Sequence, residues 1–339
     1  MVPLVTALLE AGDPLGALEL LDRYESGSGA LYSRVASGLG SAGLDAMAAR
    51  TWEHVLELAP GDATALARVV ASNPLRAVEI LRAGLQEGAG RPDLVRSLAE
   101  VLLKVGELGE AREIALEILR TSPTDLRALA VLTTADPLVA ETRLRERLED
   151  ERLPATDARS MSGLLARMLA AQQREDEAAD LLVARIDAGE EYSGLRWTLI
   201  ELQPVRAFEY LSRTLPVDGT GTIVCDLWDS NGDALSEAGY EELATEAWVR
   251  ALETGLPYVE DVLDKLYVLA PDRVMPALAR RLREAPTSEL WGALGDARWS
   301  AGRASEAIDA WTEAGSLNPE QEWWLEQVAA ARAGRDPLE

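Results

Sequence analysis

The chain has 339 residues, of which 47% are hydrophobic, 27% are charged and only 5% are aromatic, a balance that excludes a disordered chain. Its 58 acidic and 33 basic residues give a formal net charge of −25, and so acidic a surface repels nucleic acid and anionic lipid. We therefore expect the partner to be another protein or peptide with a basic segment, and we expect neither nucleic-acid binding nor membrane insertion. An equal alternative is that the acidity only keeps the chain soluble. The sequence shows no leader and no run of about 18 apolar residues, so we expect a cytoplasmic protein.

Two kinds of helical segment alternate along the chain, and the first kind is short. In it a proline is followed three residues later by a small or β-branched residue, and then by leucines at intervals of four. Proline suits the first position of a helix, where its missing N–H costs nothing, and Asn73 and Asp136 precede two of these prolines as natural caps. The prolines of the short units are Pro14, Pro74, Pro137, Pro204 and Pro271.

The second kind of segment is a regular helical hairpin, marked by a small residue that recurs every 63 to 67 positions. Because a small side chain permits close approach, we expect this residue to be buried where two antiparallel helices touch. The marker residues are Ala48, Ala111, Ala178, Ala244 and Ala307. Turns between helices are expected near Gly12, Gly43, Gly106, Gly239 and Gly302.

The last hairpin carries the most specific pattern, which is Trp291, Leu294-Gly295, Gly302, Ala307, Trp311 and Pro319. The two tryptophans are expected to fill the space beside the helix contact, and the proline is expected to end the second helix. This pattern resembles the tetratricopeptide repeat (TPR), in a bacterial-type array in which regular and short hairpins alternate.

The resemblance implies an all-α fold, a right-handed superhelical solenoid of about ten antiparallel helical hairpins with a C-terminal capping helix over 321–332. A single solenoid is expected over residues 1–333, with a sub-boundary near 216–222. Residues 334–339 are expected to fray.

The sequence does not assemble a reactive centre. His54 is the only histidine and Cys225 the only cysteine, which excludes a histidine-pair metal site and a disulfide within the chain. We interpret His54 as a packed or half-exposed residue and Cys225 as a buried structural thiol. The glycine-rich segment 219–222 lacks the Gly-Lys-Ser ending of a phosphate-binding loop. We therefore expect no enzymatic activity, no cofactor and no bound metal.

One acidic segment has two interpretations. Asp229, Asn231 and Asp233 have the alternating spacing of a calcium loop, but Ala234 and Tyr240 stand where that loop needs glycine and glutamate, so we do not expect calcium. In a helix, four carboxylates share one face instead and repel one another by about 0.2–0.5 kcal/mol per pair. Folding would not need them, so we hypothesise that a cationic partner relieves the repulsion. The four are Asp226, Asp229, Asp233 and Glu237.

The resemblance also implies where a partner binds, because the first helix of each TPR hairpin lines the concave groove. This places the acidic face in the groove, together with Arg96 and Glu100 of the second regular hairpin and Asp296 and Trp299 of the last. Trp299 is either an exposed aromatic anchor or a core residue.

We therefore interpret the chain as a protein–protein interaction scaffold or adaptor that binds a partner segment in the groove. The alternatives are a ligand- or peptide-sensing TPR regulator and a non-catalytic subunit of an enzyme complex. A sensor should show a closed pocket of mixed polarity, whereas an adaptor should show an open groove.

Overall fold

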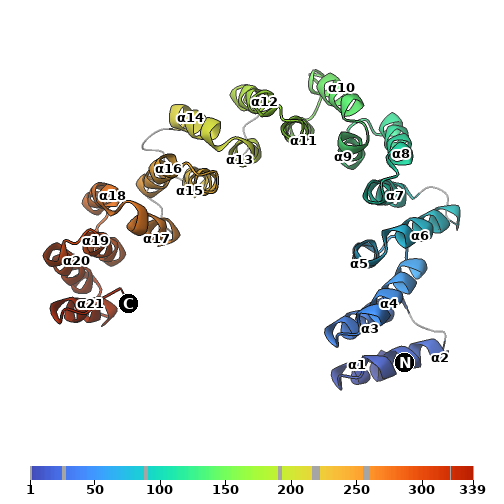
Figure 1. Cartoon of the computed structure of the whole chain (residues 1–339), viewed down its shortest axis with the longest axis horizontal. Helices are drawn as coiled ribbons and strands as arrows, with labels where there is room; N and C mark the ends of the chain where they lie inside the picture. The colour runs from blue at the N-terminus through green and yellow to red at the C-terminus, as the bar shows by residue number, and fades with distance from the viewer. Residues whose placement is uncertain are drawn as a thin grey trace. The chain divides into compact units, whose positions relative to one another are not determined.

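The structure is a computed structural model that describes residues 2–24, 28–87, 91–189, 193–215, 222–254, 260–320 and 322–338. These residues form 21 α-helices and no strand, which confirms the predicted all-α class (Figure 1). The helices are α1 (Val2–Glu10), α2 (Pro14–Tyr24), α3 (Gly29–Ser41), α4 (Asp45–Leu58), α5 (Ala63–Ser72), α6 (Pro74–Glu87), α7 (Pro92–Val105), α8 (Leu108–Thr121), α9 (Leu126–Ala135), α10 (Pro137–Leu148), α11 (Ala155–Ala171), α12 (Glu175–Asp187), α13 (Ser193–Leu202), α14 (Pro204–Thr214), α15 (Thr222–Glu237), α16 (Glu241–Glu253), α17 (Glu260–Leu269), α18 (Pro271–Glu284), α19 (Ser288–Ser300), α20 (Ala304–Leu317) and α21 (Glu322–Arg332).

Nine pairs of consecutive described helices pack as hairpins, and α11 and α12 are joined by a tight turn in which Arg174 N–H donates to the Leu169 carbonyl. The last helix, α21, packs on α20 as the predicted C-terminal cap. We call the odd-numbered helices α1–α19 first helices and their even-numbered partners second helices. The short units differ from the regular ones in the first helix, which has 9 or 10 residues in the short units and 13 to 17 in the regular ones. The alternation predicted from the sequence is therefore present in the structure.

The short units begin their second helices at the predicted prolines. Pro14, Pro74, Pro137, Pro204 and Pro271 are the first residues of α2, α6, α10, α14 and α18. Asn73 and Asp136 act as the expected caps, because their side-chain oxygens accept from the backbone N–H groups of Arg76 and Val139, each at 3.2 Å. In these two hairpins a single residue separates the two helices, so the cap satisfies an N–H that the abrupt turn would otherwise leave unpaired.

The predicted turn glycines adopt the left-handed conformation that L-residues avoid. Gly12, Gly43, Gly106, Gly239 and Gly302 have φ angles of 74° to 84°, and each lies five residues before the small residue of its unit. In the α11–α12 hairpin the same position is occupied by Gln173, the only non-glycine residue with positive φ (61°) in the described part of the chain. This turn therefore keeps the shared geometry at a steric cost.

The marker alanines are buried where they were predicted to be. Ala111, Ala178, Ala244 and Ala307 are 0% exposed and Ala48 is 7% exposed. Two glycines on first helices permit a further close contact. A Cβ on Gly232 would lie 2.4 Å from Nε1 of Trp248, and a Cβ on Gly295 would lie 2.3 Å from Nε1 of Trp311. Trp248 and Trp311 thus lie directly against the backbone of the opposing helix.

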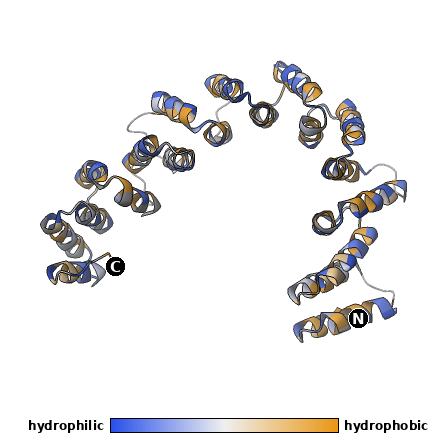
Figure 2. Ribbon diagram, in the orientation of Figure 1, coloured by the Kyte–Doolittle hydropathy of each residue, from blue (hydrophilic) through white to orange (hydrophobic). Residues whose placement is uncertain are grey.

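The described residues divide into two compact units, unit 1 (Met1–Met161) and unit 2 (Ser162–Glu339), with the division inside α11. Within unit 1, α7 packs on α9 among the first helices and α4 on α6 among the second. Within unit 2, α13 contacts α15 and α17 contacts α19, while α14, α16 and α18 pack in series. Hydrophobic and hydrophilic residues are mixed within the individual helices (Figure 2).

Two predictions on chain organisation are not tested by the structure. One is a single solenoid over residues 1–333. The other is a sub-boundary near 216–222, where residues 216–221 lie outside the described residues. Among the helices described, none is long and apolar enough to cross a membrane.

Candidate functional site

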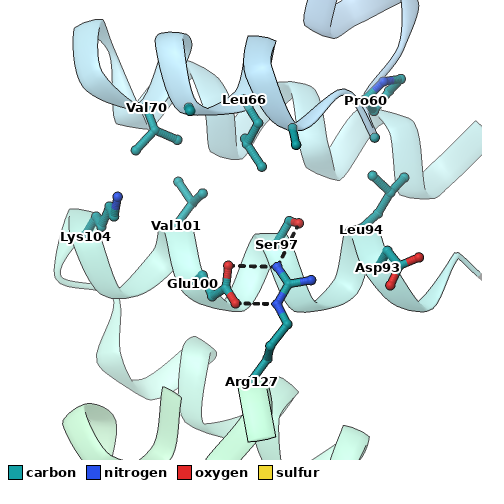
Figure 3. A pocket seen from close by; sticks show the side chains of 13 residues that line it. Pro60, Leu66, Val70, Asp93, Leu94, Ser97, Glu100, Val101, Lys104 and Arg127 are labelled. Atoms are coloured by element: carbon teal, nitrogen blue, oxygen red, sulfur yellow. Dashed lines mark hydrogen bonds and ion pairs between the residues drawn. The ribbon is translucent and has the colours of Figure 1, made fainter. Parts of the chain in front are cut away.

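A hollow of about 450 Å³ opens on the first-helix side of unit 1, between α5 and α7 (Figure 3). Leu66 and Val70 of α5 form one apolar wall, and Leu94 and Val101 of α7 form the other. Leu94 and Val101 are only 2% and 4% exposed, so the α7 wall is anchored in the hydrophobic core. Exposed Ala63 and Ala67 also line the hollow, so it is open to solvent. We call this feature the α5–α7 hollow.

Charged residues border the α5–α7 hollow, and most of them are already paired. Arg127 of α9 donates to both carboxylate oxygens of Glu100 at 2.6 and 2.8 Å, and to Oγ of Ser97 at 3.4 Å. The hydrogen bonds that Arg127 donates to Glu100 outweigh burial and raise the pKa of Arg127. Asp93 is paired with Arg96 at 3.0 Å. The sequence placed Glu100 on this side of its hairpin, and the hollow indeed includes it.

Lys104 is the exception among these charged residues. It lies in the last turn of α7, at the end of the hollow beside Val70 and Val101 (Figure 3). Its ammonium group is exposed and makes no hydrogen bond or ion pair with any residue that the structure describes. Sequence reasoning missed Lys104 and Arg127, although Lys104 is one of only two lysines in the chain.

In unit 2, the acidic segment is helical, as its 3.6-residue spacing predicted. Residues 226–237 lie within α15, so Asp226, Asp229, Asp233 and Glu237 are spaced along one helix. Asp226 and Glu237 are exposed, whereas Asp229 and Asp233 are half-buried.

The repulsion within this acidic face is relieved inside the chain, which corrects the premise that folding does not need it. Nζ of Lys265 on α17 donates to Oδ1 of Asp229 at 3.1 Å and to Oδ1 of Asp233 at 2.5 Å. Burial lowers the pKa of Lys265, but the hydrogen bonds to Asp233 and Asp229 outweigh burial and leave that pKa raised. The pairing was hard to foresee because the lysine comes 36 and 32 residues later in the chain.

Asp233 and Asp296 have a second, structural contact in common. Nε1 of Trp248 donates to Asp233 at 3.2 Å, and Nε1 of Trp311 donates to Asp296 at 2.8 Å. Each aspartate follows the glycine that its tryptophan ring covers and lies 15 residues before that tryptophan. The repeated Gly-Asp pair, 15 residues before a tryptophan, could therefore have been used to predict which carboxylates accept a hydrogen bond from an indole N–H. Partner binding by these two carboxylates remains a prediction.

Trp299 is half-buried and packs against the core of the last hairpin. Its ring centroid lies 5.8 Å from that of Trp311, and its Nε1 donates to Oδ1 of Asp336 at 3.1 Å. Of the two interpretations offered by the sequence, this geometry favours core packing over an exposed anchor.

The single thiol and the single imidazole have ordinary surroundings. Cys225 is 4% exposed, and burial raises the pKa of its thiol despite a hydrogen bond with Thr254 that lowers it, as expected for a structural residue. The ring of His54 packs edge-on against Tyr32 at 4.6 Å, and its side chain is 44% exposed. Across the described ranges, no group of three or more His, Cys, Asp or Glu residues is arranged to hold a metal ion.

The sequence matches no protein-family model and no curated protein. Solved structures resemble it at low identity. A chain of the Naa15/Naa10 complex bound to HypK-THB shows 15% identity and a TM-score of 0.43, covering 97% of this chain and 59% of that one. The present chain therefore spans 59% of the length of that relative. A chain of the APC/C hetero-tetramer Cut9-Hcn1 shows 14% identity and a TM-score of 0.33, covering 97% of this chain and 76% of that one.

TTC0263, a thermophilic TPR protein of Thermus thermophilus, shows 16% identity and a TM-score of 0.20, covering 78% of this chain and 92% of that one. With TM-scores below 0.5, none of these resemblances carries an argument about this chain. The hairpins, the turn glycines and the buried alanines themselves define the class: an all-α repeat protein built from TPR-like helical hairpins.

Proposed function

We propose that the chain is a protein-interaction scaffold, and that segments of its partners bind on the first-helix side. The observation that carries the proposal is the α5–α7 hollow, which combines apolar walls with charged borders on the first-helix side. Binding sites typically have such an apolar interior with a few polar groups that fix orientation. Lys104, Arg127 and Asp93 are exposed, so the hollow is open, as an adaptor surface requires, rather than closed like a sensor pocket.

Charge favours a basic partner segment on unit 2. This unit has 33 acidic and 16 basic residues, whereas unit 1 has 25 and 17. On α15, Lys265 occupies Asp229 and Asp233, which leaves the exposed carboxylates of Asp226 and Glu237 to meet a partner's lysine or arginine. Because exposed charges are screened within about 8 Å at physiological ionic strength, this contribution should weaken as salt rises.

A scaffold of this kind binds its partners without a catalytic step. The only histidine is packed on Tyr32, and the only cysteine is buried with a raised pKa, so neither supplies an activated base or nucleophile. The scaffold uses shape and charge alone.

The test is affinity capture on the immobilised intact chain from an extract of its native source, quantified by mass spectrometry. Ala67→Gln places a longer side chain in the α5–α7 hollow, and the same change at exposed Ala83 of α6 is the matched control on a second helix. Partners retained by the unmodified chain and by Ala83→Gln should be lost from Ala67→Gln. Equal capture by all three proteins would refute the α5–α7 hollow as a binding surface for those partners.

A further inference from the structure

The charged residues that border the α5–α7 hollow define the chemistry of what it accepts. Glu100 is neutralised by the two hydrogen bonds from Arg127. Asp93 lies 3.0 Å from Arg96, a cation that it shares with Asp125 at 2.6 Å. The ammonium group of Lys104 is the one charge on this border that lacks an opposite partner within the described residues. An unpaired cation at the end of an apolar cleft is complementary to a carboxylate attached to an apolar group.

We propose that the α5–α7 hollow binds an extended peptide segment in which an apolar side chain is followed two residues later by an aspartate or glutamate. Side chains two positions apart in an extended chain share one face, about 7 Å apart. The apolar side chain enters between Leu66 and Val70 of α5 and Val101 of α7, and the carboxylate meets Lys104 (Figure 3). This inference rests on the proposed function, because it specifies what the scaffold holds in unit 1.

The net charge of the chain opposes this selection, and the local pairing explains why the site overcomes it. Charges farther away than the screening length of about 8 Å act weakly at physiological ionic strength. Within the hollow, Arg127 neutralises Glu100, and Arg96 offsets part of the charge of Asp93, which reduces the repulsion of an anion there. The site therefore differs from the acidic face of α15, which favours a cation.

Lys104 also has a structural role that the test must separate from binding. A cation in the last turn of a helix is favoured by the unpaired backbone carbonyls there, and Lys104 lies in the last turn of α7. If that were its whole role, replacing it would change thermal stability but not peptide preference.

The experiment measures binding of the full chain to blocked peptides of the form acetyl-Gly-Ser-X-Ser-Z-Ser-Gly-amide by isothermal titration calorimetry. X is varied over all residue types, and Z is Glu, Gln or Lys. We expect tightest binding when X is Leu, Met or Phe and Z is Glu, with about two- to fivefold weaker binding when Z is Gln. Lys104→Gln should abolish that difference, Lys104→Glu should reverse it in favour of Lys at Z, and Lys104→Arg should preserve it. Arg68→Gln removes an equal charge from α5 outside the hollow and should change nothing.

Several outcomes would overturn the inference. No saturable binding, a preference for Lys at Z, or a preference for Glu that survives Lys104→Gln would each contradict it. Such a failure is distinct from failure of the scaffold proposal, because capture of partners could still depend on Ala67. Conversely, selective peptide binding together with partner capture that does not depend on Ala67 would refute the scaffold proposal and leave only a peptide-binding site.

Discussion

The α11–α12 turn allows a mutation to test the repeat geometry without touching the core. Gln173 has φ 61° at a position where five other units have glycine. A non-glycine residue in this left-handed conformation costs about 1–2 kcal/mol. Glycine has greater conformational freedom in the unfolded chain, which lowers the stability of the fold by about 0.4–1 kcal/mol and offsets part of the relief of strain. The side chain of Gln173 is exposed and makes no described hydrogen bond, so little else is lost, and Gln173→Gly should stabilise unit 2 by about 0.5–1 kcal/mol.

For a unit of this size, that gain corresponds to about 1–4 °C in Tm, measured by circular dichroism during thermal unfolding. Two further variants check the reasoning. Gly239→Gln, at the equivalent turn before α16, should destabilise the same unit, and Gln172→Gly, one residue earlier but without positive φ, should leave the Tm unchanged or lower it. If Gln173→Gly matched Gln172→Gly in sign, backbone strain at this turn would be disproved.

Three more predictions concern unit 2 and are measured as changes in thermal or urea unfolding. Gly295→Ala should destabilise by about 1–3 kcal/mol because the new Cβ meets the indole of Trp311, and an unchanged Tm would contradict that contact. Ala307→Leu should cost about 1–3 kcal/mol by overpacking a fully buried helix contact, and a wild-type unfolding curve would show that its register is wrong. Asp233→Asn should destabilise by about 0.5–1 kcal/mol near neutral pH by weakening the ion pair with Lys265. Folding raises the pKa of Lys265, so the ion pair contributes its full stabilisation below the unfolded pKa of Lys265 and loses it as pH rises through the higher folded pKa. Stability of the unmodified chain that is just as high in strong alkali would refute the ion pair.

The fold could be predicted from the sequence because close helix contacts admit few residue types. Ala111 and Ala307 are small where a larger side chain would clash, Gly302 supplies a left-handed turn, and Pro74 opens a helix. These are local requirements, and they recur every 63 to 67 residues. Residue type does not identify every such turn, because Gln173 adopts the same left-handed backbone conformation without being glycine.

The candidate site was less predictable because its contacts join residues from different hairpins. Lys265 neutralises carboxylates of the preceding hairpin, and Arg127 reaches back from α9 to Glu100 on α7. Both pairings join residues at least 27 positions apart, which the i,i+3 and i,i+4 rules for one helix do not cover. The α5 wall of the hollow was also missed, since Leu66 and Val70 read as ordinary apolar positions of a short helix.

Site-specific photo-cross-linking shows whether partners bind on the first-helix side. A benzoylphenylalanine residue is introduced at Ala67 in the α5–α7 hollow, or at Ala83 on the second helix α6, and the chain is irradiated with its captured partner. We expect a cross-linked adduct from position 67, mapped to one segment of the partner, and none from position 83. Adducts from position 83 alone would place the partner on the second helices and refute binding on the first-helix side.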